Sequence, residues 1–217
     1  MGHSCALRVR QWAAIREGDE AFGDAGAEDV IPAGIRRRMG KLERLAVRCT
    51  LGLLASGTTS EIIFCSRYGN IETLGSMFAS IAADELISPM AFSGSVHNAA
   101  PGLVAQIRKE KIPHTALSAG PHTFESGLIE AYTRLATEAY SDVVVSYADL
   151  PLPELYNEYE VECQPGLALA LRLVLSTADK MDFDVQPGRA GVLELLARLQ
   201  REGTELVVRG EGWVARR

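Results

Sequence analysis

The chain alternates short apolar runs with longer amphipathic stretches, and the two patterns predict different elements. An apolar residue at every third or fourth position is typical of a helix, whereas a short and nearly continuous apolar run is typical of a buried strand. The short runs predict strands at 6–12, 61–67, 114–117, 142–148, 166–176 and 204–209. The amphipathic stretches predict helices at 36–54, 71–83, 97–109, 120–140 and 192–202. Strands that alternate with helices indicate an α/β layered fold.

The stretch 36–54 illustrates how a helix is expected to cover the sheet. Its apolar residues fall mostly on one helical face, and they are Met39, Leu42, Leu45, Ala46, Cys49, Leu53 and Leu54. The runs 61–67 and 142–148 are almost entirely apolar, which indicates strands that are covered on both faces. Polar or proline-rich segments at 17–34 and 151–165 are expected to be loops.

Composition and charge narrow the class of protein. A chain of 217 residues fits one domain, 1–217, and buries roughly 70% of its unfolded surface. The hydrophobic fraction of 47% is that of an ordinary globular protein, and no stretch reaches the ~18 unbroken apolar residues of a membrane span. The net charge of −6 argues against nucleic-acid binding, because phosphate contacts need a basic surface.

The cysteines indicate neither a metal site nor a disulfide framework. The four of them lie far apart, form no CxxC pair and have no histidine nearby at zinc-ligand spacing. The N-terminus also lacks the apolar core of a signal peptide. We therefore expect a cytoplasmic protein with reduced thiols, no metal and no cofactor of its own.

The segment His114–Gly120, with the sequence HTALSAG, carries the strongest hint of chemistry. Its small residues suit a sharp turn from a strand into a helix. Such a turn lifts one side chain beside the helix N-terminus, whose unpaired N–H groups favour negative charge. In an enzyme that position suits a nucleophile, but here it is held by Leu117, which cannot be acylated.

Two other residues remain open as nucleophiles in a small stand-alone acyltransferase. Ser118 follows Leu117 directly, but the segment lacks the G-x-S-x-G pattern and no base is identifiable for it. Cys163 lies in the proline-rich loop without a histidine nearby in the sequence. A free-standing acyl-binding module is a third possibility.

The turn resembles the elbow of ketosynthases in the thiolase superfamily, which has the pattern T-A-C-[AS]-S-G. Residues 115–120, TALSAG, fit that pattern with leucine in place of the cysteine. Upstream, the segment 87–102 is similar to the ketosynthase segment that begins I-S-P and ends N-x-x-A-G. Asn98 matches the asparagine of that family segment, and Pro101 stands where the family usually has alanine. The strand at 142–146 also resembles the strand after the active-site helix.

The resemblance implies a fold and a role. It identifies the chain as similar to the β-ketoacyl synthase-like N-terminal domain family, and in particular to the chain-length-factor-like subunits that serve aryl polyene biosynthesis. The implied fold is a thiolase-like half-fold, with a mixed β-sheet and helices on both faces. The chain has about half the length of an ordinary ketosynthase, and His97, His114 and His122 precede the positions of the family's two catalytic histidines.

The resemblance further implies a partner and a set of site residues. The implied partner is a full-length ketosynthase that supplies the catalytic cysteine and histidines, so that this chain is a non-catalytic subunit of polyene or fatty acyl chain elongation. The acyl tunnel would involve Met90, Ala91, Phe92 and Leu117. The residues expected at the partner interface, within about 94–117, are Ser95, Asn98, His114 and Thr115.

A basic run could bring in a second partner. It comprises Arg36, Arg37, Arg38, Lys41, Arg44 and Arg48. Such a run could dock an acidic acyl carrier protein, whose phosphopantetheine would deliver the acyl chain. Charge runs of this kind usually form only a solvated helix face, so both interpretations stay open.

Overall fold

A computed structural model of the chain describes residues 7–18, 20–26, 30–54, 60–137, 139–159, 165–176, 183–184, 188–202 and 207–209. The strands are β1 (Leu7–Arg16), β2 (Glu20–Gly23), β3 (Glu61–Cys65), β4 (His114–Leu117), β5 (Val143–Asp149), β6 (Leu167–Leu175), β7 (Phe183–Asp184) and β8 (Val207–Arg209). Among the described residues they form one eight-stranded sheet in the order β4-β3-β5-β6-β1-β8-β7, with β2 paired to β1. The N-terminal strand therefore lies in the interior of the sheet rather than at its edge.

The sheet is mixed in strand direction, as predicted. Strands β4 and β5 run parallel to β3 on its two sides. Strand β6 is antiparallel to both β5 and β1, and β7 is parallel to β8. Parallel neighbours need crossover connections, which the helices between β3, β4 and β5 supply.

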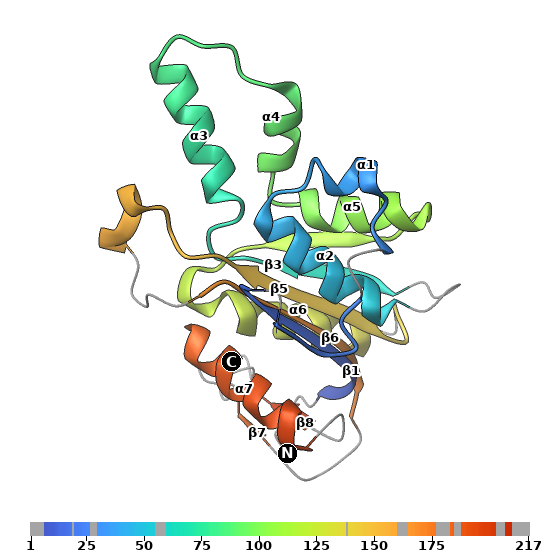
Figure 1. The fold of residues 1–217 in the computed structure, drawn as a ribbon. Helices are drawn as coiled ribbons and strands as arrows, with labels where there is room; N and C mark the ends of the chain where they lie inside the picture. Colours follow the sequence, from blue (N-terminus) through green and yellow to red (C-terminus); the bar gives the residue numbers. More distant parts are fainter. Residues whose placement is uncertain are drawn as a thin grey trace.

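Seven α-helices are present in the described part of the chain. They are α1 (Ala33–Arg36), α2 (Lys41–Leu53), α3 (Ile71–Ala82), α4 (Pro89–Ser95), α5 (Ala99–Arg108), α6 (Thr123–Ala136) and α7 (Gly188–Glu202). Figure 1 shows α2 and α5 on one face of the sheet and α6 and α7 on the other. None of the helices described is long and apolar enough to cross a membrane.

The alternation of side chains along a strand divides the core into two layers. On β3, Ile62 and Phe64 face the layer that contains α2 and α5. Ile63 and Cys65 face the layer that contains α6 and α7. All five residues of β3 and all seven of β5 are buried, which confirms the prediction of strands covered on both faces.

Gly127 allows α6 to lie close against β3. A Cβ atom added at this glycine would collide with the Sγ atom of Cys65. The sheet and the helix that follows the strand-to-helix turn are therefore held at a fixed separation.

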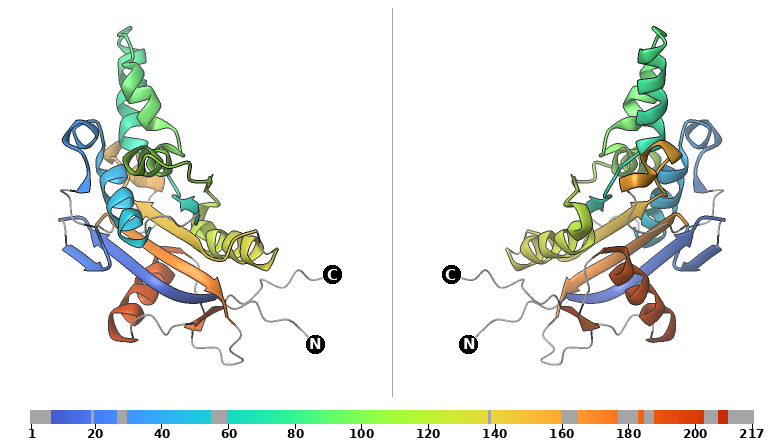
Figure 2. Two further views of the ribbon diagram at one scale, coloured as in Figure 1. Left: turned by 90° about the vertical axis from the view of Figure 1, so that its right-hand side faces the viewer. Right: turned by 90° about the vertical axis from the view of Figure 1, so that its left-hand side faces the viewer.

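Helices α3 and α4 form a projection that we call the arm, residues 71–95. Figures 1 and 2 show the two helices side by side and extending away from the sheet. Asn70 caps α3 by accepting a hydrogen bond from the Thr73 N–H, and Ser88 caps α4 in the same way from the Ala91 N–H. Large apolar side chains remain exposed on the arm: Phe78, Ile81, Leu86, Ile87, Met90 and Phe92.

Two predicted elements differ from the structure in the N-terminal third. The helix expected at 36–54 is divided, because α1 ends at Arg36 and α2 begins at Lys41 after Gly40, whose extended backbone starts the new helix. The predicted burial of its apolar face is confirmed. Within the expected loop 17–34, β2 folds back onto β1 through a turn in which Gly18 has a φ of 101°.

Other bounds shift by a few residues. Helix α4 lies in a segment for which no helix was predicted. Helix α6 is shorter than the predicted 120–140, because a 3-10 turn at Gly120–His122 precedes it, and α7 begins four residues before the predicted 192–202. Strand β8 covers the last three residues of the predicted strand 204–209, and residues 204–206 lie outside the described residues.

Candidate functional site

The strand-to-helix turn predicted from the sequence is present. Strand β4 ends at Leu117, and the 3-10 turn Gly120–His122 leads directly into α6. The backbone N–H of Ala119 donates to Oγ1 of Thr123 over 3.0 Å, and that hydroxyl donates to the carbonyl of Gly120 over 2.7 Å. Gly120 has a φ of 58°, a left-handed conformation that glycine adopts without steric cost.

Leu117 occupies the end of the strand and is half-buried. Its side chain packs against the core layer that contains Cys65 and Phe124. Its carbonyl accepts a hydrogen bond from the Ser66 N–H over 3.3 Å and lies 3.1 Å from Nε2 of His97. A hydrogen bond to that carbonyl requires the proton on Nε2, so His97 serves as a donor to the backbone. A hydrocarbon side chain at this position has no atom that could carry a covalently bound acyl group.

The structure describes only one of the two alternative nucleophiles, Ser118. Ser118 is exposed, and its hydroxyl donates to the carbonyl of Arg67 over 2.9 Å. A serine that donates to a carbonyl is not held against a general base, which an activated serine requires. Cys163 lies outside the described residues.

The loop beside the turn is held by a buried carboxylate that the sequence analysis did not single out. Oδ1 of Asp149, at the end of β5, accepts hydrogen bonds from Oγ of Ser66 over 2.7 Å and from the N–H of Arg67 over 2.9 Å. Burial raises the pKa of Asp149, while its hydrogen bonds with Tyr147 and Ser66 act in the opposite direction. In the sequence, the signal that could have pointed to Asp149 was its place as an acid directly after the mostly apolar run 142–148.

Strand β4 is an edge strand, because β3 is its one neighbour in the described sheet. His114 and Thr115, both expected at a partner interface, are half-buried on this strand. Nδ1 of His114 lies 3.0 Å from the carbonyl of Ile112. An edge strand presents unpaired backbone groups that can pair with another chain.

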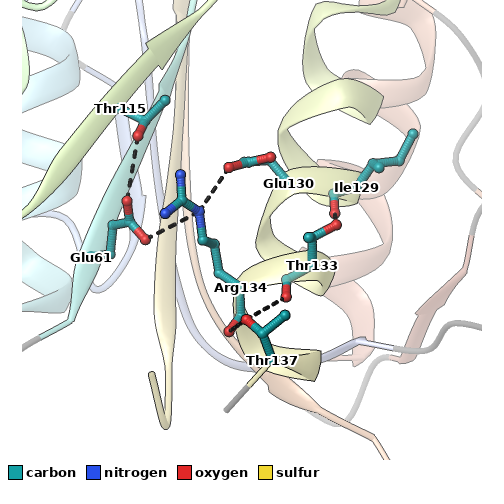
Figure 3. A network of polar contacts seen from close by, with 7 residues as sticks. All are labelled: Glu61, Thr115, Ile129, Glu130, Thr133, Arg134 and Thr137. Carbon is teal, nitrogen blue, oxygen red and sulfur yellow. Dashed lines mark hydrogen bonds and ion pairs between the residues drawn. The ribbon is translucent and has the colours of Figure 1, made fainter. Parts of the chain in front are cut away.

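Thr115 also joins a polar network at the N-terminal end of β3, shown in Figure 3. Its hydroxyl donates to Oε1 of the buried Glu61 over 3.4 Å. Nε of Arg134, on α6, lies 3.6 Å from Oε2 of Glu61 and 2.7 Å from Oε1 of Glu130. The edge strand, the sheet and α6 are therefore linked by charged groups at the end opposite to Leu117.

The remaining candidate residues lie on or next to α4. Met90 and Phe92 are 54% and 60% exposed, and Ala91 is half-buried. Ser95 is buried and donates its hydroxyl to the carbonyl of Phe92 over 2.8 Å, within the last turn of α4. Asn98 is exposed at the start of α5.

A cavity of about 300 Å³ lies between α2, α4 and α5. Met90 and Asn98 both line it. Ala91, Phe92 and Leu117 do not, so this cavity does not bring the four residues expected in an acyl tunnel together.

The basic run at 36–48 is only partly on the surface. Arg37, Arg38, Lys41 and Arg44 are exposed. Arg48 is buried and donates from Nε to the carbonyl of Gly26 over 3.4 Å, so it belongs to the packing between α2 and the loop after β2.

Metal binding and thiol chemistry would depend on the His, Cys, Asp and Glu side chains. No group of three or more His, Cys, Asp or Glu side chains that could hold a metal ion occurs among them. Cys49 and Cys65 are free thiols, and burial raises the pKa of both.

Comparisons with known proteins show which proteins this chain is similar to. The model of a family described as β-ketoacyl synthase, N-terminal domain, matches residues 10–210. A chain of a solved complex, the ketosynthase (ApeO) with its chain length factor (ApeC) from Xenorhabdus doucetiae, is similar with 25% sequence identity and a TM-score of 0.75. That match covers 94% of this chain and 95% of the other. None of the curated proteins matches the chain.

Two more distant structures share the fold. The ishigamide ketosynthase/chain length factor is 14% identical with a TM-score of 0.61, over 81% of this chain and 64% of the other. A β-ketoacyl synthase from Burkholderia phymatum STM815 is 11% identical with a TM-score of 0.59, over 79% of this chain and 59% of the other. This chain thus spans less than two thirds of both chains.

Proposed function

The chain belongs to the β-ketoacyl synthase N-terminal domain family, and from this premise we propose that it is a non-catalytic, chain-length-factor-like subunit. In this proposal it pairs with an active ketosynthase and helps to form the tunnel for a growing acyl chain. The products would be polyene or fatty acyl chains, as in aryl polyene biosynthesis.

The observation that carries the proposal is Leu117 at the end of β4. Acyl transfer at such a turn needs a thiol or hydroxyl, and the leucine side chain has neither. The neighbouring Ser118 donates its hydroxyl to a backbone carbonyl. In this proposal the nucleophile for condensation comes from the ketosynthase.

The free edge of β4 and the arm support a large partner interface. A strand of the ketosynthase would pair with β4 and satisfy its outward N–H and C=O groups. The apolar side chains on the arm would supply the hydrophobic part of the contact. A permanent interface of this kind buries on the order of 2,000 Å² or more.

The tunnel and the carrier protein are further parts of the proposal. Met90, Ala91 and Phe92 on α4 would limit the length of the acyl chain, with the small Ala91 leaving room for it. The acyl group would arrive on the phosphopantetheine of an acyl carrier protein, docked by the partner or by Arg37, Lys41 and Arg44. This chain would hold no cofactor itself.

The test is to purify the chain alone and together with a ketosynthase that retains its cysteine and both histidines. We expect stable 1:1 co-elution, and condensation of acyl substrates by the pair. Mass spectrometry of the chain after incubation with acyl carrier protein should find no acyl adduct. An adduct on Ser118 or Cys163 of the lone chain would instead support a stand-alone acyltransferase.

Product length tests the tunnel separately. Replacing Ala91 with phenylalanine should shorten the products of the pair, while co-elution stays intact. Products of unchanged length would show that α4 does not limit the tunnel.

A further inference from the structure

The cavity between α2, α4 and α5 is not explained by the proposed acyl tunnel. Its walls combine apolar side chains, among them Met90, Val96 and Leu103, with a few polar ones. Its volume of about 300 Å³ is within the range of small binding pockets. Asn98 lines it and makes no capping hydrogen bond to α5.

One wall of the cavity holds a buried carboxylate with an unused oxygen. Glu43, in the first turn of α2, is 3% exposed, and its Oε1 accepts a hydrogen bond from Nδ2 of Asn70 over 2.6 Å. Its Oε2 is buried without a hydrogen-bond partner in the described part of the chain. Leaving a charged group buried and unpaired is costly, so such an oxygen marks a place where a donor is missing.

We propose that this cavity receives a lysine or arginine side chain of the partner subunit, whose terminal nitrogen pairs with Glu43. The inference rests on the proposed function, because the occupant is part of the ketosynthase. The apolar walls suit the aliphatic stem of such a side chain, and the carboxylate suits its charged end.

The charges on the arm side of the cavity favour a cation. The sequence from Tyr68 to Ile107 contains no lysine or arginine, and the acids on the arm are Glu72, Asp84 and Glu85. Arg38 also lines the cavity, but its Nε donates to the carbonyl of Gly34 over 3.1 Å and no ion pair joins it to Glu43 among the described contacts. Among the described contacts, Oε2 of Glu43 is therefore left without a cation of this chain.

The position of the cavity favours the partner subunit as the source of that cation. Val96, Asn98 and Gln106 line the cavity and belong to the segment proposed to contact the ketosynthase. The cavity is thus continuous with the proposed interface. A side chain that enters it would be enclosed when the two subunits join.

The test compares the affinity of the ketosynthase for the wild-type chain and for Glu43→Gln. Truncating one member of a buried charge pair weakens binding strongly, so we expect the dissociation constant to rise about 30-fold or more. The control Glu194→Gln removes the same charge from an exposed position on α7, across the sheet from the cavity, and should change the constant less than about threefold.

Proton release supplies a second readout. Burial raises the pKa of Glu43 in the free chain, with Glu72 adding to the rise and the Asn70 amide and nearby backbone N–H groups opposing it. Pairing with a cation would lower the pKa of Glu43, so any Glu43 that is protonated in the free chain would release its proton on binding. Calorimetry in buffers of different ionisation enthalpy should then show fewer protons released when Glu43→Gln binds than when the wild type binds.

A variant that leaves Glu43 in place tests the cavity itself. Gly102 lines the cavity, and a Cβ atom added there would have no atom within 4 Å. Gly102→Leu should fill the cavity without disturbing the fold, and weaken pairing more than Gly102→Ala does. Denaturant unfolding of each free variant checks that it is folded.

The outcomes separate this inference from the proposed function. Wild-type affinity in both Glu43→Gln and Gly102→Leu would overturn the inference while the subunit role stands. An equal loss in Glu194→Gln would also overturn it, because the effect would then be general electrostatics. Failure of the wild-type chain to pair with the ketosynthase would overturn both.

Discussion

The centre of the sheet and the arm use similar side chains in opposite environments. Phe64, on β3, is 2% exposed, whereas Phe78, on α3, is 56% exposed. Leu86, between α3 and α4, is 100% exposed, although leucine is among the residues most often buried in proteins. The sheet and its helices therefore complete their own core, while the arm carries apolar surface that the chain itself does not cover. A patch of this kind marks an interaction surface.

The largest expected loss of stability is that of Phe64→Ala, and Phe78→Ala is its matched comparison. Phe64→Ala should lower the free energy of unfolding by about 3–5 kcal/mol, because it leaves a cavity in a closed layer of the core. Phe78→Ala, the matched change on the arm, should lower it far less. Urea denaturation of both variants measures the difference, and equal losses would mean that the arm is as well packed as the sheet.

A smaller effect is expected at Asp149, which joins the sheet to the loop beside Leu117. Asp149→Asn keeps one acceptor oxygen, which can stay at the Oδ1 position for the Ser66 hydroxyl. It puts an NH2 group, which cannot accept, where Oδ2 accepts from the Arg67 N–H over 3.2 Å. The expected loss is about 1–3 kcal/mol of unfolding free energy.

The pH dependence of that loss has a definite sign. Because burial raises the pKa of Asp149 when the chain folds, the folded chain binds more protons than the unfolded chain just above the ordinary carboxyl pKa. Stability from this group therefore falls as the pH rises above about 4. The gap in unfolding free energy between wild type and Asp149→Asn should narrow from pH 4 to pH 7. A gap that widens would show that the hydrogen bonds of the carboxylate outweigh its burial.

The smallest effect on folding is expected at the tip of the arm. Leu86→Ala should change the free energy of unfolding by less than about 0.5 kcal/mol, since the side chain is fully exposed. If the arm meets the ketosynthase, the same variant should weaken pairing measurably. A strong loss of stability in the lone chain would contradict the contrast between arm and sheet.

The sequence predicts the sheet better than the arm, for a physical reason. Strands such as 61–67 and 142–148 are covered on both faces, so their continuous apolar runs leave little ambiguity. Helix α4 was missed because its exposed apolar residues show no amphipathic period within seven residues. The pair Ser88-Pro89, a cap followed by a favoured first helical residue, was the signal that could have located it.

The candidate site was likewise only partly predictable. A local pattern located the turn after β4 and the leucine within it, because small residues and chain direction act over a few positions. Glu43 and Asn70 are 27 positions apart and meet only because the fold brings the first turn of α2 to the residue that caps α3. Contacts of that kind depend on the whole fold and leave no local mark in the sequence.

The sheet ends differently at its two sides, and this limits how many chains can assemble. One end is β4, four residues long. On the other side, β1 pairs with both β2, four residues long, and β8, which is followed by β7, two residues long in the described part of the chain. A two-residue strand is a poor template for a further strand, and short edges of this kind resist edge-to-edge growth. A partner strand that pairs with β4 would leave only the short edges of β2 and β7 free in the described sheet, which favours a closed pair over a filament.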